Sequence, residues 1–564
     1  MASESVQAAA AANRDTPETA PGPVQDCRSV IHIAVFFDGT GNNNDLDSDS
    51  SKWSNVARLF QSAQIVAAND KSRTTYPIYI SGVGTPFNGK ASGWLSTAGV
   101  WVEDRLPGLG AGAGGDRRME YGRDNVNERL RDVLIANAAA LGGTAARNAA
   151  ENSNKTFAEV NGLLAEYRLI KVINLSLFGF SRGAALARAF SNRILANCAR
   201  KGGTLLYQEH PLRINFMGLF DTVASFGVPA QNARTPFTER ELIVSASVER
   251  CVHYVAAHEV RFSFPVDLIR KNGSMPMEWV EKTYPGVHSD VGGGYGPNDQ
   301  GVDSNFARIP MREMMKEALS SGARMLGYED LRKTRQTLFA TRFECRPETD
   351  KAFRRYMAAR LSVSGKVEEQ IVQHLKLYYS AHGTMHRRGM QTAGDRSRKA
   401  SAYKNIVGSK GLAHEVASYR AVLKTGQWLR LSESNIRRYA QYIQIQDWQL
   451  SAWDSTATNS VVDFISNYVH DSKVDFIGNV EPFSYFRPRG VDESCVSVWE
   501  EGGNWLQTKA KAIVHRVSAT VPLGKTNAAL GTDRGTDVED TAGTGGNSIS
   551  ERGTRWIEPK GSGR

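Results

Sequence analysis

Short apolar runs alternate with stretches of helical periodicity over the first half of the chain. The runs that predict strands lie at residues 31–37, 76–80, 169–178, 214–220, 261–264 and 279–284. Helical spacing of apolar residues at 55–63 and 183–199 predicts two of the intervening helices. Nearly continuous apolar strands separated by helices are typical of a parallel sheet that is covered on both faces. We therefore expect an α/β fold with a mainly parallel sheet, whose functional loops lie at the carboxyl ends of the strands.

Shifts in composition divide the 564 residues into regions. Residues 1–27 are rich in Ala, Pro and polar side chains and predict a disordered arm, and residues 521–564 predict a flexible tail rich in Gly and Thr. Residues 28–304 carry the strand signals and include a Gly-rich insertion at about 84–115. Residues 305–520 are more helical and more basic, and we expect them to cap the first region, contact a membrane or complete the core.

The segment GFSRG at residues 179–183 matches the G-x-S-x-G pattern and lies between a predicted strand and a helix of small residues. A serine nucleophile needs this setting, because it sits on a sharp, strained turn where Gly179 and Gly183 let the strand and the helix approach closely. Free amides at the start of the helix stabilise negative charge beside the turn. We interpret Ser181 as the nucleophile of a serine hydrolase. The alternative is a Ser that caps a helix in a protein without catalysis.

A serine hydroxyl becomes nucleophilic when a base removes its proton, and that base is usually a His oriented by a carboxylate. In α/β-hydrolases the chain order is Ser, then the acid, then His. Asp221 ends the predicted strand that follows Ser181, and His288 lies in a Gly-rich loop after the last predicted strand. This order predicts a triad of Ser181, Asp221 and His288. The simpler alternative for Asp221 is a helix cap.

Other residues of the same types leave alternatives open. His470, in the sequence VHDS, is the main alternative base, and Asp290 is the alternative orienting acid. Asp290 lies only two positions from His288, a spacing that makes the required geometry awkward. His253 and His258 lie nearer a predicted core element, so a structural role is the better interpretation for both.

A tetrahedral intermediate of ester hydrolysis needs backbone donors for its oxyanion. The amide of Arg182 is one candidate, because it follows the nucleophile directly. Gly39 and Thr40, in the loop after the first strand, are the candidates for a second donor, with an ordinary Asp-Gly turn as the alternative. The sequence contains no Walker loop, HExxH or EF-hand spacing, so we expect neither a cofactor nor a metal.

The chain carries 69 Lys and Arg against 59 Asp and Glu, a net charge of +10. A solvated surface is the simplest explanation, and an acidic membrane face is a better partner than nucleic acid, because the sequence has no dense basic run with interleaved aromatics. Its five cysteines are widely spaced and form no CxxC pair, which fits synthesis in a reducing cytosol. The sequence predicts neither a signal peptide nor an apolar membrane span.

The motifs FFDGTGNN, GFSRGAA, GLFDTV and GVHSDVGGGY, in this order, resemble a bacterial α/β-hydrolase family that includes the type VI secretion lipase effectors of the first GxSxG class. The resemblance covers about residues 30–300 and extends weakly to VHDS at 469–472 and YFRPRG at 485–490. It implies an α/β-hydrolase fold and a phospholipase A that attacks membrane phospholipids of competing bacteria with the same triad.

The resemblance also implies a route and partners. The protein would be made in the cytoplasm, delivered by the type VI system with a spike protein or adaptor, and active in the periplasm or membrane of the target. The producing cell would hold a cognate immunity protein.

Two other functions stay open on the sequence: a housekeeping esterase or thioesterase for a small acyl substrate, and a noncatalytic binding or scaffold protein with the same fold. The Gly-rich insertion and the large second region favour a bulky or interfacial substrate. Trp94, Trp101 and the basic aromatic stretch at 437–442 are candidate membrane contacts, with burial in the core as the alternative.

Overall fold

The structure is a computed structural model of the chain. It describes residues 28–85, 111–224, 242–359, 365–400, 411–428, 445–474, 484–487, 489–493 and 496–497. The predicted arm at 1–27, the predicted tail at 521–564 and the stretch at 437–442 lie outside these residues, as does most of the Gly-rich insertion with Trp94 and Trp101. All of these described residues belong to one compact unit.

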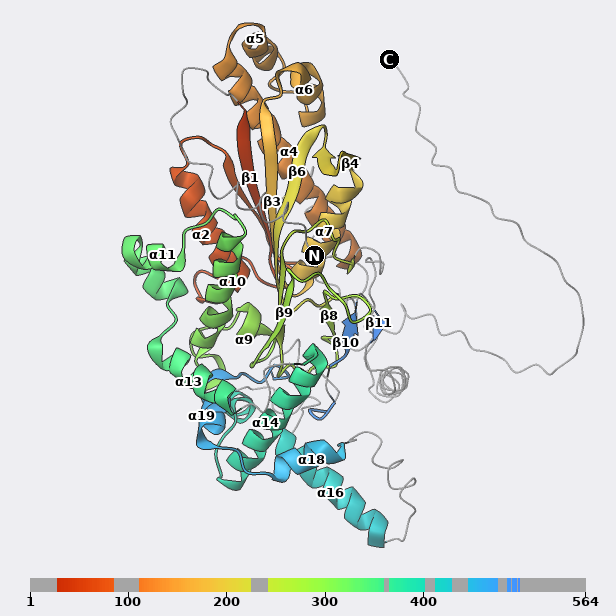
Figure 1. Cartoon of the computed structure of the whole chain (residues 1–564). Coiled ribbons are helices and arrows are strands. Elements are labelled where there is room, and N and C mark those ends of the chain that lie inside the picture. The colour runs from red at the N-terminus through yellow and green to blue at the C-terminus, as the bar shows by residue number, and fades with distance from the viewer. Residues whose placement is uncertain are drawn as a thin grey trace, which may run out of the picture. The chain divides into compact units, whose positions relative to one another are not determined.

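An eight-stranded mixed sheet lies at the centre of the described part (Figure 1). Its strands are β1 (Ser29–Phe37), β2 (Thr75–Ile80), β3 (Ile170–Phe180), β4 (Cys198–Lys201), β5 (Thr204–Tyr207), β6 (His210–Phe220), β7 (Cys251–Ala256) and β9 (Val280–Tyr284). Neighbours in the order β2-β1-β3-β6-β7-β9 are all parallel, and β4 and β5 add an antiparallel hairpin beside the start of β6. The parallel strands therefore end at one edge of the sheet.

Helices cover both faces of this sheet. They are α2 (Asn55–Asn69) and α10 (Arg308–Ser320) on one face, and α4 (Ala111–Leu141) and α7 (Arg182–Ala196) on the other. Alternation along each strand divides the apolar side chains between the faces. In β1, Phe36 points into the buried cluster beneath α2 and α10, and Phe37 points into the cluster beneath α4 and α7. The predicted α/β class with two covered faces is confirmed.

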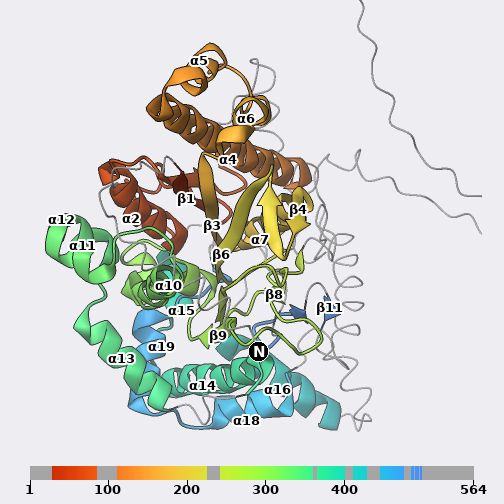
Figure 2. The same ribbon diagram turned by 45° about the horizontal axis from the view of Figure 1, so that its top comes forward.

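Beyond the carboxyl ends of the strands the chain is largely helical (Figures 1 and 2). These elements are α9 (His288–Gly292), α13 (Pro347–Ala358), α14 (Val367–Arg387), α15 (Ala393–Ala400), α16 (Leu412–Trp428), α18 (Asp447–Asp454) and α19 (Asn459–Tyr468), while α11 (Tyr328–Thr334) and α12 (Gln336–Leu338) lie beside α10 at the flank of the sheet. Tyr356 and Phe464 of this group are buried in the same cluster as Phe36 and Tyr254 of the sheet. The helices after residue 305 therefore share their core with the sheet.

The remaining elements are short or peripheral. They are α5 (Gly143–Glu151) and α6 (Phe157–Leu164), the three-stranded sheet of β8 (Val266–Leu268), β10 (Val491–Glu493) and β11 (Val496–Ser497), and helical turns at Ala165–Tyr167, Asp299–Gly301, Ser304–Ala307 and Phe339–Phe343. None of the helices within the described ranges has the length and apolar character that a membrane crossing requires.

One predicted strand is wrong. Residues 261–264 form a turn in which the Phe264 amide donates to the Arg261 carbonyl at 3.2 Å. The Arg261 side chain and its own amide both bind the Glu259 carboxylate, which leaves this stretch unable to extend into a ladder. The strands lie on either side, as β7 and β8.

Gly183 supplies a test of the close contact between α7 and the end of β1. A methyl group on Gly183 would lie 2.3 Å from the Phe37 carbonyl oxygen and 2.4 Å from that of Asp38. Gly183→Ala must therefore move backbone, and we expect it to lower the free energy of unfolding by roughly 1–3 kcal/mol.

Gly162→Ala, in α6, is the matched control. A methyl group there meets nothing within 4 Å, and helix propensity favours Ala over Gly by roughly 0.5–1 kcal/mol. Thermal and urea denaturation of both variants measures the difference. Equal melting temperatures for Gly183→Ala and Gly162→Ala would show that α7 does not need a glycine at position 183.

Candidate active site

Ser181 lies at the sharp turn between β3 and α7, with backbone angles of φ 58° and ψ −127°. A non-glycine residue with positive φ is strained, and such strain is typical of a nucleophile elbow. A methyl group on Gly179 would lie 2.4 Å from the Ala184 Cα, so both flanking glycines are needed for the strand and helix to meet. Ser181 is buried, with 4% of the residue's surface exposed.

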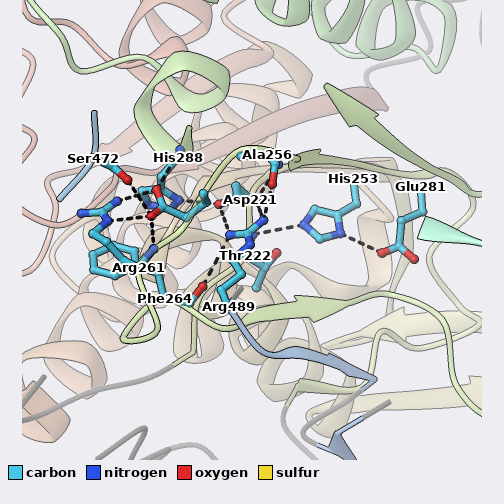
Figure 3. A network of polar contacts seen from close by, with 11 residues as sticks. Asp221, Thr222, His253, Ala256, Arg261, Phe264, Glu281, His288, Ser472 and Arg489 are labelled. Carbon is cyan, nitrogen blue, oxygen red and sulfur yellow. Dashed lines mark hydrogen bonds and ion pairs between the residues drawn. The ribbon is translucent and has the colours of Figure 1, made fainter. Parts of the chain in front are cut away.

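Asp221 lies beside this turn, at the end of the neighbouring strand β6. The Ser181 amide donates to the Phe220 carbonyl at 3.0 Å, which fixes the ends of the two strands to each other. The Asp221 carboxylate is buried, and its Oδ2 lies 2.5 Å from His288 Nδ1 (Figure 3). The Nδ1 atom of His288 is thereby engaged, and no hydrogen bond joins its Nε2 to another described residue. The structure brings together the acid and the histidine that chain order selected.

The His288 ring packs against two aromatic rings. Its centroid lies 4.7 Å from that of Phe180, the residue before Ser181, and 5.2 Å from that of Phe264. No hydrogen bond within the described residues joins Ser181 Oγ to His288, although adjacent packing places both at the same strand end. Catalytic hydrogen bonds are often long without substrate and tighten when it binds.

The charges of the pair follow from their surroundings. Burial alone would raise the pKa of Asp221, but the charge and hydrogen bonds of Arg489, together with His288, outweigh it and hold that pKa well below its usual range. Burial lowers the pKa of His288, and its interaction with Asp221 opposes that shift. A neutral imidazole beside an ionised carboxylate is the state that a general base requires near neutral pH.

Arg489 is a site residue that the sequence did not identify. Its guanidinium donates to both carboxylate oxygens of Asp221, at 2.7 Å and 2.6 Å, and to the Ala256 carbonyl at 2.7 Å (Figure 3). Only 1% of its side chain is exposed. The one available signal was the weak resemblance of YFRPRG at 485–490, which gave no reason to choose between its two arginines.

His253 has a supporting position. Its Nε2 accepts a hydrogen bond from the Thr222 amide at 3.1 Å, and its Nδ1 lies 2.8 Å from Glu281 (Figure 3). Because an accepting Nε2 carries no proton, the ring is the neutral Nδ1–H tautomer. His253 therefore fixes the backbone next to Asp221 and takes no part in the pair.

A second polar cluster, from distant parts of the chain, holds the backbone of His288. The His288 amide donates to Glu259 at 3.1 Å, and Glu259 also binds Arg261 in a two-pronged ion pair. Ser472 donates to the same carboxylate at 2.8 Å (Figure 3). Burial opposes ionisation of Glu259, but the charge of Arg261 lowers its pKa to about 2. The carboxylate is thus a fixed acceptor for the start of α9.

His470, the alternative base, pairs with Asp290, the alternative acid. Its Nδ1 lies 2.5 Å from Asp290 Oδ1, and its ring stacks on Tyr295 at 3.7 Å between centroids. Asp290 Oδ2 also accepts hydrogen bonds from the amides of Val287 at 2.9 Å and of His470 at 3.1 Å. The described residues therefore include two buried His–Asp pairs, and the second one clamps the short helix that begins with His288.

The loop after β1 lies against the elbow. A methyl group on Gly39 would lie 2.5 Å from the Phe180 ring, and the Arg182 side chain donates to the Thr40 hydroxyl. The Gly39 amide donates to Asp38 Oδ1 at 2.7 Å, so that predicted oxyanion donor is engaged. No described residue accepts from the Thr40 amide. Burial raises the pKa of Asp38 to about 6, against hydrogen bonds from Ser54, Tyr79 and Gly39.

His258 is buried away from the pair. Its Nδ1 accepts from the Gly286 amide at 2.9 Å, and its Nε2 lies 3.0 Å from the Tyr356 hydroxyl. It connects the loop before His288 to α13, and burial lowers its pKa to about 3. Over the part of the chain that the structure describes, no cluster of three or more His, Cys, Asp or Glu side chains has the arrangement of a metal site.

Comparison with known proteins identifies relatives of this chain. The model of a family described as the catalytic domain of Tle1-like phospholipase effectors of the type VI secretion system (T6SS) matches residues 32–205 and 196–317, about half of the chain. No curated protein matches.

Solved structures that match this chain include the following two. A crystal structure of an uncharacterized protein from Pseudomonas aeruginosa is 22% identical, with a TM-score of 0.51, over 92% of this chain and 71% of that one. The structure of the Tle1 effector bound to the VgrG spike of the T6SS is 19% identical, with a TM-score of 0.35, over 62% of this chain and 84% of that one. The first supports a shared fold.

Removing His470 tests whether the Asp290–His470 pair is a clamp. His470→Ala leaves the buried Asp290 carboxylate with two backbone donors and without its side-chain partner, and the loss of one partner of a buried hydrogen bond costs roughly 1–3 kcal/mol. We expect a clearly lower melting temperature in thermal denaturation. His414→Ala is the control, because His414 is exposed and substitution there should change stability by less than about 0.5 kcal/mol. Similar melting temperatures for the two variants would exclude the clamp.

Proposed function

This chain belongs to the family of Tle1-like T6SS phospholipase effectors, and we propose that it is a phospholipase A that cleaves acyl esters of membrane phospholipids by a Ser-His-Asp mechanism. The observation that carries the mechanism is the strained Ser181 beside the buried Asp221–His288 pair. We also propose that the fold is of the α/β-hydrolase type, with the helices that follow α10 as a cap. The parallel strand order and the helix that follows Ser181 directly support that assignment.

In the first step His288 Nε2 takes the proton of Ser181 Oγ while Oγ attacks the ester carbonyl carbon. Asp221, ionised and held 2.5 Å from Nδ1, stabilises the imidazolium that forms. The tetrahedral intermediate then collapses, and His288 returns the proton to the departing lysophospholipid oxygen. An acyl group remains on Ser181.

In the second step water attacks the acyl-enzyme by the same route. His288 accepts a proton from the water, and the second tetrahedral intermediate releases the fatty acid as Ser181 Oγ regains a proton. Both intermediates place a negative oxygen beside the start of α7. We assign the amides of Arg182 and Thr40 as its donors, since the side chains of these residues contact each other and Asp38 occupies the Gly39 amide.

The proposed setting follows from the family. The protein would leave the producing cell through the T6SS on a spike protein or adaptor and act on phospholipids from the periplasm of the recipient. A cognate immunity protein would protect the producer. The net charge of +10 suits an anionic membrane surface.

Substitution of the three proposed catalytic residues tests the mechanism. Ser181→Ala, Asp221→Asn and His288→Ala should each lower phospholipid hydrolysis by about 10³-fold or more, and a double variant should lose little beyond Ser181→Ala alone. Mass spectrometry of products from mixed-chain phospholipids in vesicles measures turnover and identifies the ester cleaved. Ser191→Ala, a buried Ser of the next helix that binds the Arg188 carbonyl, is the control. Near wild-type hydrolysis by folded Ser181→Ala would refute the nucleophile.

Directed expression tests the proposed site of action. Addition of a secretory signal peptide should make the protein toxic to a host that lacks the immunity protein, whereas the unmodified protein should be tolerated. The Ser181→Ala form with the same signal peptide separates catalysis from the burden of export. Growth curves and lysophospholipid content measure the result. Equal growth of wild type and Ser181→Ala in the periplasm would contradict a phospholipase toxin.

A further inference from the structure

We infer that Arg489 is a positioning residue of the proposed catalytic site, which holds the Asp221 carboxylate against His288 and makes activity depend on the segment formed by residues 484–487 and 489–493. The catalytic role of the Asp221–His288 pair rests on the proposed function. The clamp itself stands on contacts in the structure.

The first support is the number of donors on one buried carboxylate. Oδ1 of Asp221 accepts from Arg489 Nη2 at 2.6 Å and from the Ala256 amide at 2.8 Å. Oδ2 accepts from Arg489 Nη1 at 2.7 Å and contacts His288 Nδ1 at 2.5 Å. Two parallel bonds from a planar guanidinium fix both the position and the plane of a carboxylate. The arginine thus sets the direction in which Oδ2 meets the imidazole.

The second support is the backbone of Asp221 itself, which has a φ of 41°. Positive φ at a non-glycine residue costs free energy and persists only where the surroundings hold it. Here the Asp221 amide donates to the Tyr254 carbonyl at 2.7 Å, and the side chain is held by Arg489. A lone amide and a histidine would leave that strained, buried anion with far less compensation.

The third support is the way Arg489 is anchored. The Val266 amide donates to the Gly490 carbonyl at 2.9 Å, and β10, which begins at Val491, pairs in parallel with β8. On the other side of Arg489, the Tyr485 hydroxyl donates to Asp471 at 2.7 Å. The segment is therefore bound to the rest of the protein before and after Arg489. These contacts hold the Arg489 guanidinium in place next to Asp221 (Figure 3).

The arrangement has an electrostatic consequence for His288. Arg489 Nη1 and His288 Nδ1 contact the same oxygen, so they lie no more than about 5 Å apart, where a cation disfavours a second positive charge. Arg489 thus keeps Asp221 ionised and at the same time offsets part of its pull on the His288 proton. Loss of the cation should raise the pKa of His288, because Asp221 then acts on the imidazole without this opposing charge. The charges of Glu259 and Arg261, which also act on the ring, stay in place in such a variant.

Three variants separate positioning from simple support of the fold. Arg489→Met removes the charge and both hydrogen bonds but keeps an apolar stem. Arg489→Lys keeps the charge and loses the two-pronged geometry. Arg487→Met is the matched control, because Arg487 lies in the same segment with its guanidinium over the ring of Phe262, 4.1 Å from the centre.

The measurements are the pH profile of kcat/KM on a soluble short-chain ester and an NMR titration of 13C-labelled histidine, in which His288→Ala assigns the His288 signal. For Arg489→Met we expect about 10²-fold lower kcat/KM and an acidic limb and His288 titration about one pH unit higher. Arg489→Lys should lose about tenfold in kcat with both midpoints unmoved. Arg487→Met should match the wild type in kcat/KM, in the acidic limb of the pH profile and in the His288 titration.

Unmoved midpoints in Arg489→Met, with activity lost only in proportion to folded protein, would reduce Arg489 to a structural residue and overturn the inference. If Arg489→Met does not fold, Arg489→Lys decides: wild-type kcat in that variant overturns the inference, and a tenfold loss in folded protein supports it. The NMR titration needs no turnover. A failure of Ser181→Ala to abolish hydrolysis would therefore refute the proposed function without touching the Arg489 result.

Discussion

A carboxylate buried at the end of a parallel strand is the constraint on which the candidate site depends. Asp221 has no exposed surface, so its charge must be matched by donors inside the protein. Those donors come from three places: the backbone at Ala256, the imidazole of His288 and the guanidinium of Arg489. Satisfying one anion therefore draws together segments up to 268 residues apart in the chain.

A second buried aspartate, Asp290, also binds a histidine, but it has a different role. One oxygen of Asp290 contacts Nδ1 of His470, and the other accepts hydrogen bonds from two backbone amides. Asp290 therefore shapes the loop that carries His288. The two pairs share a composition and differ in what surrounds them. One stands beside a strained serine, and the other lies beneath a stacked tyrosine. Environment, more than residue type, decides which pair can serve as acid–base machinery.

The residues that brace the site extend well past the part of the chain that the family model matches, which ends at 317. Ser472 binds Glu259, His470 binds Asp290 and Arg489 binds Asp221. The helices after residue 305 bury their aromatic side chains in the same cluster as the sheet. Packing and polar contacts therefore both tie the carboxyl-terminal half to the strand ends that hold Ser181.

Local pattern by itself determined β1, β2, β3, β6, β9 and the elbow, because strand burial, helix periodicity and glycine spacing act over a few residues. It missed β7 and the shorter strands, and it placed one strand wrongly at 261–264. Chain order selected Asp221 and His288, and the structure places them in contact, while their catalytic roles stay a prediction. Only the tertiary structure decided that His470 takes Asp290, that Asp38 engages the Gly39 amide and that Arg489 clamps Asp221. A buried carboxylate is stabilised by the donors that the fold brings within about 3 Å. When those donors lie far away in the sequence, no local sequence pattern predicts the contact.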